Sequence, residues 1–284
     1  MDNNEKVEKK EEVLDMEKIR EYFKNFIDVY ILAANKANLP SNRELLDDII
    51  DNAKIEAYDL SDTTGTFAVN RKYIGIIMKN FMNNSSDRNR FLLLHEFTHF
   101  SSGINNELFL DQNALLERLN NEAQGVRGNN VSGVNAYYGM VAIDEVLAQW
   151  TCEELNDAIK ARKREIHEFS RGPLESDVRF KSDFSDNDIY SPLEPVVEKF
   201  IQALGYADFR DFATNFLASS KGIIDDIKGK NYEKLCQLGV ICKAIYKEQG
   251  FSSRVTVSKE DVERAYDLLM KNVDFGENNG GEER

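Results

Sequence analysis

The chain of 284 residues is 42% hydrophobic and carries 36 Lys and Arg against 50 Asp and Glu, which gives a formal net charge of −14. Such a chain can bury a substantial core, and its acidic balance argues against a nucleic-acid backbone or an anionic membrane surface as the main partner. It has no run of about 18 apolar residues that would span a bilayer and no signal-peptide pattern at its start. We therefore expect a cytoplasmic protein, although secretion by a route without a signal peptide would leave no trace in the sequence.

The cysteines agree with that expectation. Cys152, Cys236 and Cys242 are odd in number and have no C-x-x-C spacing. This usage is typical of free thiols in a reducing compartment.

The first part of the chain alternates between helical and extended patterns. Apolar residues recur at helical spacing over residues 13–38, and Ser41 with Glu44 forms a capping-box start for a second helix that we expect to reach about Ala57. Short apolar segments then flank a polar region at residues 59–70, and residues 73–78 have the strongest strand pattern. A strand edge beside a catalytic site can pair with an extended substrate, although a small sheet can equally serve only the core.

The segment Leu92–Phe100 carries the strongest chemical signal. We expect it to lie on a helix that ends near Ser101, where His95 and His99 share one face, so that both imidazoles can bind one ion. Glu96 can reach a water on that ion but is placed poorly to ligate it. Zinc held by three side chains lowers the pKa of such a water to about 7, and a carboxylate beside it can act as general base. These polar groups are costly to bury without a partner, so we interpret the H-E-x-x-H motif as a zinc site.

The rest of the chain is predicted to be largely helical. Residues 125–139 are rich in Gly and Asn, so we expect a loop there. The predicted helices after the histidine motif span 107–123, 141–165, 191–204, 207–219, 231–249 and 258–272. With the strands this gives an α+β fold that is mostly α. A break near residue 182 divides it into a disordered lead (1–12), a domain with the histidine motif (13–182), a helical subdomain (183–272) and a disordered tail (273–284).

A catalytic zinc site needs a third ligand. An extended form of the motif has a third histidine ten residues after the first and a glycine three residues before that histidine. Here these positions hold Asn105 and Ser102, so the extended form is excluded. Glu145 is the alternative: it lies among small and apolar residues early in a long helix, where a charged side chain needs a partner. The remaining acidic candidates are less suitable but stay open; they are Glu107, Glu117 and Glu122.

With these residues the sequence resembles the gluzincins, the thermolysin-like class of zinc metallopeptidases. In that class two histidines on one helix and a glutamate on a later helix bind the ion. The resemblance covers His95, Glu96, His99 and Glu145 with their helices, together with a strand before them and a helical domain after them. It implies a zincin-like fold and one zinc per chain, bound by His95, His99 and Glu145, with Glu96 as general base and a peptide or protein as substrate.

The resemblance also implies supporting residues. Many gluzincins have an acidic residue one turn after the glutamate ligand, which holds a histidine through its other nitrogen; here that position is Gln149, whose amide oxygen can accept the same N–H. Asp144 is its rival, although its place on the helix is expected to direct it elsewhere. A Tyr or His stabilises the oxyanion in this class, and the candidates are Tyr138, ranked first, then Tyr137 and His167.

The resulting hypothesis is a cytoplasmic zinc metallopeptidase, an endopeptidase whose zinc-bound water is activated by Glu96. Two other hypotheses compete with it. One is a zincin-fold binding or regulatory protein with little or no hydrolysis, which the intact Glu96 disfavours. The other is a helical interaction protein without zinc, whose melting temperature a chelator would leave unchanged.

Overall fold

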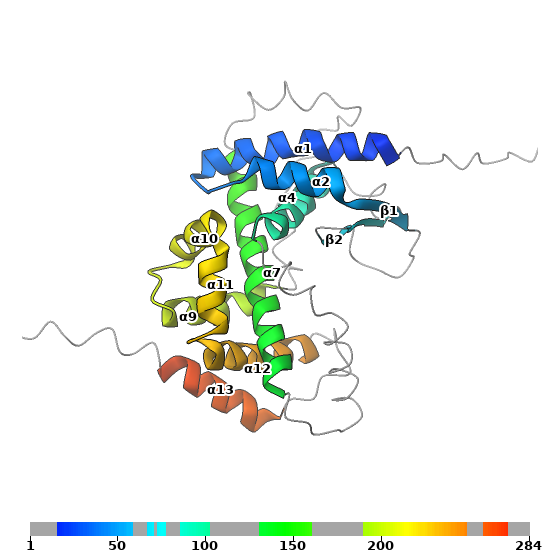
Figure 1. The fold of residues 1–284 in the computed structure, drawn as a ribbon. Coiled ribbons are helices and arrows are strands. Elements are labelled where there is room, and N and C mark those ends of the chain that lie inside the picture. Colours follow the sequence, from blue (N-terminus) through cyan, green and yellow to red (C-terminus); the bar gives the residue numbers. More distant parts are fainter. Residues whose placement is uncertain are drawn as a thin grey trace, which may run out of the picture.

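The structure is a computed structural model that describes residues 16–58, 67–70, 73–77, 86–102, 131–160, 190–248 and 258–271 (Figure 1). Over these residues the protein is mostly helical with one small sheet, which confirms the mostly α character of the predicted α+β class. The predicted helix at 107–123, the lead, the tail and the boundary near residue 182 lie outside the described residues.

The N-terminal pair of helices is partly as predicted. Helix α1 (Met16–Ala37) fits the apolar pattern of residues 13–38. Helix α2 (Arg43–Asn52) is capped by Asn42, whose side chain accepts from the Leu45 N–H, and not by Ser41. The helix was expected to reach Ala57, which is wrong: the chain turns extended at Ala53 and continues as strand β1 (Lys54–Tyr58). Pairing with a later strand outweighs local helix propensity here.

The sheet has three strands in the order β1-β3-β2. Strand β3 (Tyr73–Ile77) is central, parallel to β1 and antiparallel to β2 (Phe67–Asn70). The strand predicted at residues 73–78 is therefore confirmed, and β2 lies in the short apolar segment at the end of residues 59–70. Strand β2 contacts helix α4 (Ser86–Ser102), which carries the histidine motif.

Helix α7 (Val131–Lys160) begins inside the segment predicted as a loop at 125–139. Glycines on two helices explain why the prediction was wrong. A Cβ on Gly139 would meet the Leu235 carbonyl at 2.4 Å, and one on Gly239 would meet the Asn135 carbonyl at 1.7 Å. The glycines therefore let α7 pack directly against helix α12 (Tyr232–Glu248), and this packing stabilises a helix that propensity disfavours.

The C-terminal part follows the predicted order of helices, with one addition. A 3-10 turn, η2 (Ser191–Leu193), opens α9 (Glu194–Ala203), and Ser258 caps α13 through the Asp261 N–H. Helix α11 was not predicted. The elements after η2 and α9 are α10 (Phe209–Ala218), α11 (Ser220–Lys228), α12 and α13 (Lys259–Lys271).

Helix α7 runs between the N-terminal helices and the C-terminal helices (Figure 1), and its two ends belong to two different hydrophobic clusters. The first is built by α1, α2, the sheet, α4 and the end of α7 from Cys152 to Ile159. The second is built by the start of α7, from Ala136 to Leu147, and the C-terminal helices. Trp150 packs against both. Within the described residues no helix combines the length and apolarity needed to cross a membrane.

Candidate metal centre

The two motif histidines lie on the inner face of α4. Four buried apolar side chains anchor this helix in the first cluster; they are Leu93, Leu94, Phe97 and Phe100. The imidazoles are themselves almost fully buried, and His95 Nε2 lies 3.0 Å from His99 Nε2. The four-residue spacing thus turns both Nε2 atoms toward the same point.

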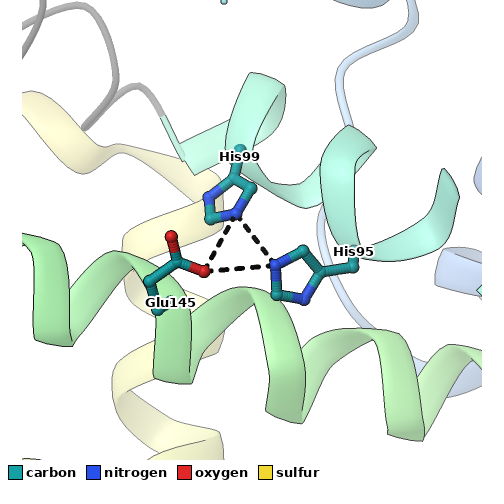
Figure 2. A group of neighbouring side chains, drawn as sticks. All are labelled: His95, His99 and Glu145. Atoms are coloured by element: carbon teal, nitrogen blue, oxygen red, sulfur yellow. Dashed lines mark hydrogen bonds and ion pairs between the residues drawn. The ribbon is translucent and has the colours of Figure 1, made fainter. Parts of the chain in front are cut away.

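Glu145 approaches this point from α7, the helix that packs against α4 (Figure 2). Its Oε2 lies 3.3 Å from His95 Nε2 and 3.5 Å from His99 Nε2. The three ligand atoms of His95, His99 and Glu145 form a group that can hold a metal ion. The other acidic candidates, Glu107, Glu117 and Glu122, lie outside the described residues.

The three contacts cannot all be favourable hydrogen bonds while Glu145 is ionised. A protonated Nε2 cannot accept, and an unprotonated one presents a lone pair. If both nitrogens carry protons, the contact between His95 and His99 is repulsive. If one lacks a proton, its lone pair can accept from the other nitrogen but still faces the carboxylate oxygen of Glu145, which is also an acceptor. A cation between the three atoms removes this conflict.

The dimensions of the triangle suit zinc. Ligand atoms about 2.0–2.1 Å from a tetrahedrally bound zinc lie about 3.3–3.4 Å from one another. The observed edges are 3.0, 3.3 and 3.5 Å. Two imidazoles and a carboxylate are also an established donor set for catalytic zinc, which keeps a fourth position open. The residues therefore fit the metal that the sequence predicts.

The charges around the site are strongly coupled. Burial alone would raise the pKa of Glu145, but His99 and His95 hold that pKa well below its usual range. Burial alone would lower the pKa of His99, but the carboxylates of Asp144 and Glu145 raise it well above its usual range. Without a cation the site therefore favours the protonated form of His99 between the carboxylates of Asp144 and Glu145.

Of the two predicted supporting residues, the structure brings Asp144 to the site. Asp144 Oδ2 lies 2.9 Å from His99 Nδ1, whereas the Gln149 amide donates to Glu153 at 2.7 Å. The expectation that Asp144 points elsewhere was wrong. Asp144 and Glu145 reach opposite edges of the same ring, while Gln149 lies about 6 Å further along the helix and is engaged with the next turn.

Glu96 lies beside the ligands and is partly exposed. Burial raises the pKa of Glu96 above its usual range, and the positive charges of His99 and His95 oppose that rise. A carboxylate with a raised pKa next to a metal-bound water is suited to take up a proton and release it again. The role of Glu96 as the base stays a prediction.

The tyrosines nearest to Glu145 differ from those ranked first in the sequence. Tyr138 packs against Tyr246 and Lys243. Burial raises the pKa of Tyr137, and the charge of Glu145 adds to that rise. His167 lies outside the described residues. Tyr190 was missed: its ring stacks on His95 with 5.9 Å between centroids, and its hydroxyl donates to Glu145.

Tyr246 is a second tyrosine near Glu145 that the sequence analysis did not identify. Burial raises the pKa of Tyr190 and Tyr246, and the Glu145 charge adds to both rises. Tyr190 follows a long segment without a clear pattern, and Tyr246 is far along the chain, so no local signal in the sequence marks either residue.

Comparison of the chain with protein-family models, with curated proteins and with solved structures finds no match in any of the three. The geometry of the site is therefore the basis for its functional interpretation.

Proposed function

We propose that the protein is a zinc metallopeptidase of the gluzincin type, with a zincin-like arrangement of sheet, histidine helix and helical C-terminal part. The observation that carries this proposal is the convergence of His95, His99 and Glu145 from two helices. Glu96 lies beside them with a raised pKa. A structural zinc site is closed by four protein ligands, whereas the part of the chain that the structure describes offers three at this point, with Glu96 next to His95 in the sequence.

In the proposed reaction His95, His99 and Glu145 would hold the ion. When bound, zinc supplies a Lewis acid and lowers the pKa of its water to about 7. Glu96 accepts the proton of the attacking water while the water oxygen adds to the peptide carbonyl carbon. Glu96 then gives that proton to the leaving nitrogen as the C–N bond breaks, so the products are a carboxylic acid and an amine.

Tyr190 is the best placed of the described tyrosines to stabilise the oxyanion. Its ring is fixed by stacking on His95, and its hydroxyl lies at Glu145. The pKa of this phenol is raised by burial and by Glu145, so it stays protonated at neutral pH. In the proposed role its one proton turns from Glu145 to the oxyanion. Preorganised donors of this kind contribute strongly to acyl-transfer catalysis.

Strand β2 offers a place for the substrate. It is an edge strand of the described sheet and contacts α4. An extended peptide that pairs with such an edge would run past the histidine helix. This arrangement supports a peptide or protein as substrate.

The test is a Glu96→Gln variant that is zinc-loaded and incubated with a mixture of unrelated peptides, with products analysed by mass spectrometry. We expect full zinc content and a loss of new termini, because the amide cannot act as a base. Glu198→Gln, an exposed change on α9, is the control and should cleave like the wild type. Equal cleavage by Glu96→Gln would contradict the proposal, and so would a zinc-loaded wild type that cleaves no peptide.

A further inference from the structure

A second carboxylate borders His99 on the side away from Glu145. Asp144 directly precedes Glu145 on α7 and is only 4% exposed. Its Oδ2 lies 2.9 Å from His99 Nδ1, while Glu145 Oε2 lies 3.5 Å from His99 Nε2. Two consecutive residues of one helix therefore contact the two nitrogens of one imidazole.

Ser102 holds the other oxygen of this carboxylate. It is fully buried on the last turn of α4, and its Oγ lies 2.9 Å from Asp144 Oδ1 and 3.0 Å from the His99 carbonyl oxygen. A hydroxyl has one proton to donate, and a hydrogen bond to an ionised acceptor is about twice as strong as one to a neutral carbonyl. The Ser102 proton therefore favours Asp144.

The Nδ1 atom of His99 depends on this carboxylate. It is buried and has no other partner within the described residues than Asp144 Oδ2, which lies 2.9 Å away. The alternative tautomer would set the Nδ1 lone pair against the carboxylate and put a proton on the nitrogen that faces His95 and Glu145.

We infer that Asp144 is a positioning residue that keeps the proton of His99 on Nδ1, and that Ser102 fixes Asp144 for this task. The Nε2 lone pair of His99 is then free for the ion. This inference rests on the proposed metal site. It assigns the support of the second histidine to the residue just before the glutamate ligand and to a serine on the histidine helix itself.

The experiment measures zinc affinity of the full chain by competition with a chromophoric chelator, for the wild type, Asp144→Asn, Asp144→Ala and Ser102→Ala. Loss of such a supporting group weakens metal affinity by about 10–100-fold, which we expect for Asp144→Ala. Asn keeps an acceptor oxygen, so Asp144→Asn should recover part of the loss, and Ser102→Ala should lose less than Asp144→Ala. Ser101→Ala is the control, because the Ser101 hydroxyl bonds the Phe97 carbonyl; its affinity should equal that of the wild type.

A second readout separates positioning from a merely structural role. Nitrogen-15 NMR of the zinc-loaded wild type should show the His99 proton on Nδ1, and Ser102→Ala should shift that resonance while the melting temperature of the chelated protein changes little. Because removal of a buried carboxylate can also destabilise the fold, Ser102→Ala tests the inference independently of Asp144→Ala.

The possible failures are distinguishable. A wild type that binds zinc, beside Asp144 and Ser102 variants of equal affinity, would overturn the inference and leave the proposed function standing. A proton on Nε2 of His99 in the loaded wild type would also overturn it. A wild type that binds no zinc would overturn the proposed function and this inference with it.

Discussion

The crossing of α7 and α12 allows a sharp prediction for the variant Gly239→Ala. The new Cβ would lie 1.7 Å from the Asn135 carbonyl oxygen, so backbone atoms must separate by at least about 1.3 Å to reach the 3.0 Å below which real contacts essentially never occur. Overpacking of a core costs about 1–3 kcal/mol and occasionally more. The higher helix propensity of Ala offsets up to about 1 kcal/mol of that cost. Because the obstacle is backbone, we expect a net loss of about 2 kcal/mol or more in the free energy of unfolding.

Urea denaturation followed by circular dichroism measures this loss, with Gly222→Ala as the matched control. Gly222 also lies in a helix, but a Cβ there would meet nothing within 4 Å, so the control should be unchanged or more stable by up to about 1 kcal/mol. For a chain of this size, the loss in Gly239→Ala corresponds to a melting temperature lower by about 4–8 °C. If the two variants were equally stable, direct backbone packing of α7 on α12 would be refuted.

Three further predictions concern the site and its surroundings. In protein freed of metal by a chelator, the ion pairs of His99 with Asp144 and Glu145 raise the folded-state pKa of His99. The stability that these ion pairs contribute is complete below the unfolded-state pKa of about 6.5, and it is lost as the pH rises through the raised folded-state pKa. A urea series across pH should show this decline in the wild type and not in His99→Gln, and equal slopes would contradict it. Tyr190→Phe should keep its zinc and lose about 10²–10³-fold in turnover if Tyr190 is the oxyanion donor, with Tyr138→Phe as the control; full turnover in Tyr190→Phe would exclude that role. Arg210 lies over Trp150 at 5.4 Å, pairs with Glu154 and donates to the Ala37 carbonyl. Arg210→Ala should therefore alter the fluorescence of this single Trp, and it should lower the free energy of unfolding by no more than about 1 kcal/mol because the ion pair is largely exposed. An unchanged emission spectrum would contradict the contact between Arg210 and Trp150.

The parts of the fold that were predictable depend on local patterns. Helix α1, the central strand β3 and the cap at Ser258 follow from periodicity and capping residues next to one another in the sequence. The histidine pair is of the same kind, because a spacing of four residues fixes its geometry on a helix. The convergence of Glu145 on that pair followed from a weaker signal, a charged residue among buried neighbours.

The parts that were missed depend on contacts between distant segments. Residues 131–139 are helical because Gly139 and Gly239 allow two helices to touch, which no local propensity reveals. The end of α2 is set by strand pairing in β1. Asp144 and Tyr190 reach the site through the packing of α7 against α4 and η2, whereas the expectation for Gln149 relied on its sequence position alone.

The central claim is that His95, His99 and Glu145 hold one zinc ion, and metal content tests it most directly. We would measure zinc by plasma mass spectrometry in the purified full chain, in Glu145→Ala and in Glu153→Ala, an exposed position on the same helix. The account predicts about one zinc per chain in the wild type and in Glu153→Ala, and much less in Glu145→Ala. Full zinc in Glu145→Ala would move the third ligand elsewhere, and absence of zinc from all three proteins after incubation with the metal would contradict the claim.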